Sequence, residues 1–122
     1  IMNGWSKKPS LIAAVELQAG LVKKTKALTK EIFEGIVSKT PVASGSLRAS
    51  WRIGVNAVDE SISFQQSHSN PLPAPKFNMP KFNFGDPIFI SNSLPYVFDV
   101  ENGSSSQAPQ GMVRVTLASV KV

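Results

Sequence analysis

Few residues in this sequence have the type and spacing that catalysis requires. The one histidine, His68, lies between Ser67 and Ser69, and a histidine beside a hydroxyl is the pair from which an activated nucleophile is built. The surrounding residues are polar and rich in proline, which is typical of a surface loop. We therefore interpret His68 as an ordinary surface residue and expect no general base here.

The acidic residues do not indicate a catalytic pair either. Asp99 and Glu101 lie two positions apart, so their side chains diverge on a helix and share one face on a strand. Neither arrangement specifies acid–base chemistry. The segment 103–111 lacks the lysine and the glycine spacing of a phosphate-binding loop. The chain has no cysteine, which excludes thiol nucleophiles and cysteine-ligated metals. We expect no enzyme, no cofactor and no metal.

Length, composition and charge describe one basic domain. The chain has 122 residues, 42% of them hydrophobic, which is enough for a single apolar core. No apolar stretch approaches the ~20 residues of a membrane-spanning helix, so we expect a soluble protein. The net charge is +5, and residues 1–39 hold seven lysines against three glutamates. A basic face suits a phosphate backbone or an acidic neighbouring subunit, although charge runs are usually solvated faces.

An aromatic residue between two arginines supplies the alternative function. Arg48, Trp51 and Arg52 lie close together in the sequence, and cations beside aromatic rings suit single-stranded nucleic acid. The same pattern fits a strand whose Trp51 points into the core while the arginines point outward or pair with an acidic residue. A small basic DNA-binding module is therefore our alternative interpretation.

The periodicity of the apolar residues predicts one long helix and a hairpin in the first half of the chain. Between residues 11 and 37 apolar residues recur with the 3.6-residue period of an amphipathic helix. Thr40-Pro41 ends this helix because the residue before proline disfavours helical backbone angles. Residues 51–55 and 62–65 alternate apolar and polar side chains, which predicts two antiparallel strands.

Further elements are expected in the second half. Residues 87–92 are rich in β-branched and aromatic types, which favours a third strand. Pro95 opens a short helix or turn, and Asn102-Gly103 ends it. The pattern over 112–122 fits either a strand or one face of a helix, and alternation alone favours the strand.

Residues 68–87 differ in kind from the rest of the chain. They hold five of the nine prolines and three of the seven phenylalanines. Proline-rich segments prefer extended conformations, and exposed aromatic clusters usually mark contact sites. We expect an extended arm that a partner orders; the alternative is a loop that folds back on its own core. The expected interface residues of the arm are Lys76, Phe77, Met79, Lys81, Phe82 and Phe84.

Two stretches of the chain match a pair of sequence signatures in both order and spacing. Residues 40–51, TPVASGSLRASW, resemble the signature T-P-V-D-T-G-x-L-R-x-S-W. Residues 92–114, which contain NSLPY, VENGS and QAPQGMVR, resemble N-x-x-P-Y-A-x-x-x-E-x-G-x-S-x-Q-A-P-x-G-M-V-R. Both are signatures of the neck (head–tail connector), tail-completion and minor tail-component proteins of tailed bacteriophages. The matched residues are Pro41, Gly45, Leu47, Arg48, Trp51, Pro95, Tyr96, Glu101, Gly103, Gln107, Pro109 and Gly111.

The resemblance implies an α+β protein in one domain, 1–122. It implies a long N-terminal helix packed on a small antiparallel β-sheet, and a C-terminal helix over 112–120 in place of a strand. It also implies an ion pair between Arg48 and Glu101 that joins the two signature segments.

The resemblance further implies a structural virion protein that is assembled in the host cytoplasm. Copies of the protein form a ring, which we expect to be a hexamer, at the head–tail junction or proximal tail. The ring joins head to tail around the DNA channel. Its expected partners are other neck, portal-side and tail proteins, with non-specific contact to DNA and none to a membrane.

Overall fold

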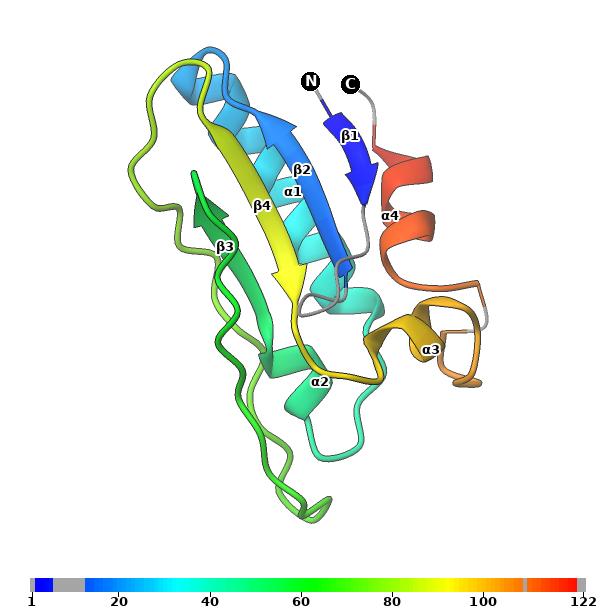
Figure 1. Ribbon diagram of the computed structural model, residues 1–122. Helices are drawn as coiled ribbons and strands as arrows, with labels where there is room; N and C mark the ends of the chain where they lie inside the picture. The colour runs from blue at the N-terminus through cyan, green and yellow to red at the C-terminus, as the bar shows by residue number, and fades with distance from the viewer. Residues whose placement is uncertain (1, 6–12, 109, 121–122) are drawn as a thin grey trace.

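The computed structural model describes residues 2–5, 13–108 and 110–120 and shows an α+β fold (Figure 1). Four strands form one antiparallel sheet in the order β1-β2-β4-β3, with α1 behind it and α2 and α3 at the end where β3 begins. The elements are β1 (Met2–Trp5), β2 (Ala13–Gln18), α1 (Val22–Lys39), α2 (Ser46–Ala49), β3 (Trp51–Val55), β4 (Pro87–Asn92), α3 (Val97–Glu101) and α4 (Val113–Ser119). No helix in the described part of the chain combines the length and apolar character needed to cross a bilayer.

The core lies between the sheet and α1. Alternate residues of a strand point to opposite faces, and the strand side chains that face α1 are buried, whereas α1 contributes buried residues at helical spacing. This core is built chiefly from Val15, Leu17, Ile32, Phe33, Ile36, Trp51, Ile88 and Ile90. α4 packs against α1 and adds Val113 and Thr116 to the buried set.

The helix predicted over 11–37 is wrong in its first half. β2 occupies Ala13–Gln18, and α1 begins only at Val22. Val15 and Leu17 are buried whereas Glu16 and Gln18 are not, so the apolar period at this point is two residues and not 3.6. The long helix therefore follows strands in the chain instead of preceding the whole sheet.

The predicted hairpin is also wrong, although its first strand exists. β3 forms at 51–55, but it pairs antiparallel with β4, with Ile53 opposite Ile90. Residues 62–65 do not form a strand of the sheet. The strand predicted at 87–92 and the short helix after Pro95 are confirmed. The helical alternative for 112–120 is confirmed by α4.

A long connection joins β3 to β4 and has one limb on each face of the sheet. The outgoing limb lies over the face opposite α1, where Ser91 Oγ donates to the carbonyl of Asp59 over 3.2 Å. The chain then extends past α2, turns, and returns along α1 (Figure 1). On this return limb the ring of Phe77 lies 6.2 Å from that of Phe33, centroid to centroid.

The return limb folds back on its own chain over most of its length. Phe77, Met79 and Phe82 are partly buried and pack against the core, whereas Lys76 and Lys81 are exposed. Of the six residues expected to contact a partner, Phe84 is the most exposed apolar one, at 79%. The free arm expected at 68–87 is therefore not confirmed, because Phe77 and Phe82 are partly buried against the chain's own core.

Candidate functional site

The two segments that carry the signatures lie side by side at the end of the sheet where β3 begins. The backbone N–H of Val42 donates to Gln107 Oε1 over 3.1 Å. The side-chain amide of Asn92 donates to the carbonyl of Leu47 over 2.8 Å. A cleft of about 190 Å³ lies between the segments, and Tyr96 contributes to its wall. Partial burial raises the pKa of the Tyr96 hydroxyl above its ordinary value.

Trp51 fixes the first signature segment to the end of α1. Its side chain is buried, and the indole N–H donates to Thr40 Oγ1 over 2.9 Å. The Thr40 hydroxyl in turn donates to the carbonyl of Ile36 over 2.8 Å. The chain of two hydrogen bonds ties the start of β3 to the last turn of α1, so the inward orientation expected for Trp51 is confirmed.

Gly45 and Arg48 hold the return limb of the long connection at Leu72. Gly45 has φ +83°, and a Cβ atom there would lie 2.5 Å from the backbone nitrogen of Leu72, so only glycine allows this crossing. The N–H of Leu72 donates to the carbonyl of Ser44 over 2.9 Å. Arg48 Nη2 donates to the carbonyl of Leu72 over 2.8 Å. The first signature is thus the anchor of the connection.

Glu101 organises the second signature segment. Its side chain is fully buried, and Oε1 accepts the N–H groups of Met112 and Val113, both over 2.8 Å. Oε2 accepts the N–H of Arg114 over 2.9 Å. The first N–H groups of a helix have no partner within the helix, and a carboxylate is favoured at this end by the helix dipole. Glu101 therefore caps α4 from a distance in sequence.

The ion pair expected between Arg48 and Glu101 is wrong. Arg48 binds the backbone of Leu72, while the carboxylate of Glu101 is occupied by the start of α4. Among the described residues, the cation paired with that carboxylate is Arg114, at 3.8 Å between Nε and Oε2, and its side chain is 58% exposed. The two signature segments are joined instead by the hydrogen bonds from Val42 to Gln107 and from Asn92 to Leu47.

The remaining signature residues have structural roles or lie at the surface. Gly103 and Gly111 have positive φ angles of 92° and 93°, which suit glycine. Pro41 is half-buried beside the cleft, Leu47 is in the core and Pro95 is exposed. Pro109 lies outside the described residues.

Sequence reasoning missed two serines that hold residues 61–66. Ser50 Oγ donates to the carbonyl of Ser63 over 2.9 Å and accepts its N–H over 3.0 Å. Ser46 Oγ binds the carbonyl and N–H of Gln65 in the same way, over 3.0 and 2.9 Å. Positions i and i+4 lie about 5–6 Å apart on a helix, close to the two-residue rise of an extended chain. The i, i+4 spacing of Ser46 and Ser50 is therefore the feature of the sequence from which these contacts with an extended segment could have been predicted.

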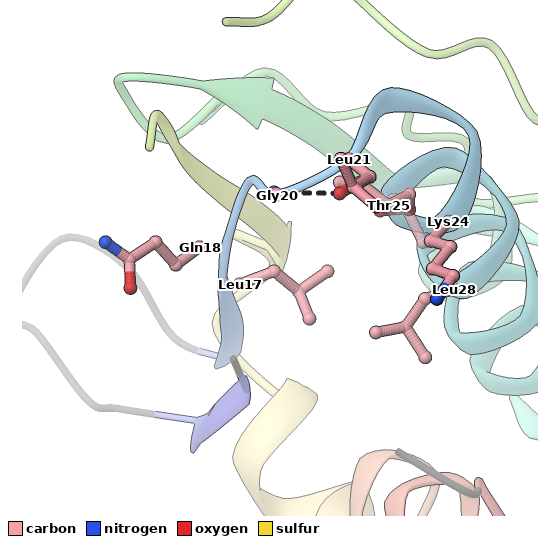
Figure 2. A pocket seen from close by; sticks show the side chains of 8 residues that line it. Leu17, Gln18, Gly20, Leu21, Lys24, Thr25 and Leu28 are labelled. Atoms are coloured by element: carbon pink, nitrogen blue, oxygen red, sulfur yellow. Dashed lines mark hydrogen bonds between the residues drawn. The ribbon is translucent and has the colours of Figure 1, made fainter. Parts of the chain in front are cut away.

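The residues weighed as catalytic or metal-binding candidates do not form a site in the part of the chain that the structure describes. His68 and Asp99 are exposed, and no three His, Cys, Asp or Glu residues within it lie close enough to hold a metal. A cleft of about 240 Å³ between β2 and α1 is lined by Leu17 and Leu28, with Lys24 at its rim (Figure 2). Figure 2 also shows the N–H of Gly20 bound to the Thr25 hydroxyl at 2.9 Å. Gln18, Thr25 and Thr29 also line this cleft, and the Thr29 hydroxyl donates to the carbonyl of Thr25 over 2.7 Å.

The exposed charges are basic on the first half of α1. Lys23, Lys24, Lys26 and Lys30 are exposed, and no acidic residue lies between them.

On the outgoing limb, the Ser61 hydroxyl donates to Asp59 Oδ1 over 2.6 Å. This hydrogen bond, with a smaller contribution from nearby Arg52, holds the pKa of Asp59 below its ordinary value.

Comparison of the chain with protein-family models, with curated proteins and with solved structures gives no match.

Proposed function

We propose that the protein is a non-enzymatic structural component of a tailed-phage virion. In this proposal, copies of the chain form a ring at the head–tail junction or proximal tail and join head to tail around the DNA channel. The observation that supports it most is the contact between the two signature segments, made by the Val42 N–H and Gln107 Oε1 at 3.1 Å. Two unrelated chance matches would have no reason to meet in space, so their contact supports treating them as one functional unit.

The surface supports action by contact. Leu21, Val22 and Phe84 are large apolar residues with more than half of their side chains exposed, and the long connection extends past α2 (Figure 1). A head-to-tail contact repeated around an axis closes into a ring when the rotation per subunit fits. Apolar residues within an otherwise polar surface are typical of such contacts.

A second candidate, a small basic DNA-binding module, is favoured by one observation. Four exposed lysines follow one another on α1 without an intervening acid, and Lys26 and Lys81 line one shallow groove of about 340 Å³. Lysines spaced in this way can neutralise phosphates, which makes binding strongly dependent on salt.

Two measurements separate the candidates. Light scattering after size-exclusion chromatography, with negative-stain imaging, should find rings with a mass several times 13.1 kDa, six copies being expected. Titration with duplex DNA at several salt concentrations should find weak binding. The matched control replaces Lys23, Lys26 and Lys30 with Gln, which should lower DNA affinity and leave the rings intact. A monomer at all concentrations that binds DNA with a steep salt slope would establish the second candidate instead.

A further inference from the structure

The segment 61–66 has one backbone edge in use and one free. The N–H and C=O groups of Ser63 and Gln65 are bound by the hydroxyls of Ser50 and Ser46. Successive residues of an extended chain direct these groups to opposite sides. The backbone groups of Ile62 therefore point away from α2, as do those of Phe64. Within the described residues, neither has a hydrogen-bond partner for its N–H or C=O.

The free edge carries apolar side chains. Ile62 is 47% exposed and Phe64 is 59% exposed. The alternate side chains turn toward the protein, since the hydroxyls of Ser61 and Ser63 accept hydrogen bonds from the guanidinium of Arg52, each over 2.9 Å. The segment therefore has the side-chain alternation of a β-strand, with its polar side chains facing the protein, but its outer backbone edge has no hydrogen-bonded neighbouring strand.

This edge lacks the features that usually prevent strands from pairing. Exposed edges are commonly protected by charged residues, prolines or bulges. Residues 61–75 contain no Asp, Glu, Lys or Arg, and the first proline after the edge is Pro71. A charged partner strand would find no opposite charge on this edge, whereas an uncharged strand with alternating apolar residues could pack against Ile62 and Phe64.

We propose that a second copy of this chain occupies the edge, with the two 61–66 segments paired antiparallel about a two-fold axis. The axis passes between the two Ser63 residues. Ile62 then lies opposite Phe64 of the partner subunit, and the reverse pair is made by symmetry. Because Ile62 and Phe64 hold the outward backbone groups, both pairs are hydrogen-bonded pairs and four N–H···O bonds form.

The side chains of this register are self-complementary. Two isoleucines and two phenylalanines gather on one face of the paired strands, and aromatic with β-branched pairs are among the favourable cross-strand contacts. The net charge of +5 opposes association of copies, but the paired segments contain no charge, and Glu60 falls opposite Gln66 of the partner subunit. The contact is two-fold and therefore distinct from the head-to-tail contact that a ring requires.

Disulfide trapping tests the register. The chain has no cysteine, so a single introduced cysteine reports on one position. Ser63→Cys should form a covalent dimer under mild oxidation, because the two residues on the axis form a non-hydrogen-bonded pair with Cα atoms about 4.5 Å apart, within the range that disulfides accept. Ser61→Cys is the matched control, since it lies opposite Gln65 of the partner subunit and should remain monomeric on a non-reducing gel.

Sedimentation of the unmodified chain provides a second measurement. It should show a doubling of mass, of single chains or of rings, that reverses on dilution, and Phe64→Lys should raise the dissociation constant of this step about tenfold or more. Asn78→Lys is the control because it adds the same charge at an exposed position that lies outside the edge. Equal trapping of both cysteine variants, trapping of neither, or a dimer that ignores Phe64→Lys would each overturn the proposal. A ring that forms without trapping at Ser63 would support the virion function and overturn this contact alone.

Discussion

Glu101 Oε1 accepts the backbone N–H of Met112 over 2.8 Å, although the two residues belong to different helical segments. Met112 is the N-cap residue of α4 and makes no capping hydrogen bond through its own side chain. The carboxylate at the end of α3 supplies the missing acceptor, so the start of α4 is stabilised by a residue eleven positions earlier.

Replacing Glu101 should therefore destabilise the whole C-terminal segment. Glu101→Gln keeps one acceptor oxygen, but it removes the negative charge and places an NH₂ donor where three backbone N–H groups converge. We expect a loss of about 2–3 kcal/mol in the free energy of unfolding. Urea denaturation measures it. Asp99→Asn, on the same helix but exposed, is the control and should change stability by less than about 0.5 kcal/mol. Equal effects of both changes would contradict the capping role.

Two glycines separate backbone strain from steric overlap. Gly111 and Gly85 have similar φ angles, +93° and +90°, but a Cβ on Gly111 would lie 2.6 Å from the carbonyl oxygen of Glu101, whereas a Cβ on Gly85 meets nothing within 4 Å. Gly85→Ala should cost about 1 kcal/mol from the left-handed conformation alone. Gly111→Ala should cost about 3 kcal/mol or more. Thermal denaturation compares them, and similar losses for both would show that the turn at Gly111 relaxes freely.

The serine contacts should each protect one amide. Ser50→Ala removes the acceptor for the N–H of Ser63, and Ser46→Ala removes the acceptor for the N–H of Gln65. Hydrogen exchange followed by NMR should show faster exchange at Ser63 in the first variant and at Gln65 in the second, with the core amides unchanged. Each variant is the control for the other. Unchanged exchange at both amides would mean that the hydroxyls do not hold the segment.

Asp59 should contribute to the acid limb of the stability curve. Hydrogen bonding from the Ser61 hydroxyl lowers the pKa of the folded-state carboxyl, so its contribution is fully present above the unfolded-state pKa of about 3.9. The contribution is lost as the pH falls through the lower folded-state pKa. The stability difference between the natural protein and Asp59→Asn should therefore vanish in strong acid. Glu60→Gln, an exposed neighbour, is the control.

Local patterns in the sequence predicted conformation better than they predicted partners. The alternation at 51–55 and 87–92 correctly marks β3 and β4, but each strand's partner lies more than thirty residues away and leaves no local signal. Residues 62–65 are extended, as their alternation indicates, yet serine hydroxyls replace the expected strand. Over 11–37 the apolar residues of β2 happen to continue the helical period of α1, and only Gly20 marks the break.

The candidate site could be predicted as a set of residues but not as a set of contacts. The signatures identify Arg48, Trp51 and Glu101 as important, and all three side chains make hydrogen bonds that join separate segments. Their partners are a backbone carbonyl, a hydroxyl and backbone N–H groups. Such groups are present at every position in a chain, so only the fold shows which of them are used.

The connection that lies on both faces of β3 has a mechanical consequence. A strand of five residues at the rim of a sheet is normally easy to displace by a strand from another molecule. Here an invading strand could replace β3 only after the hydrogen bond between Ser91 and Asp59 and the ring contact between Phe33 and Phe77 had been broken. The connection thus holds β3 in place from both sides, and the sheet can pack against neighbouring molecules without strand exchange.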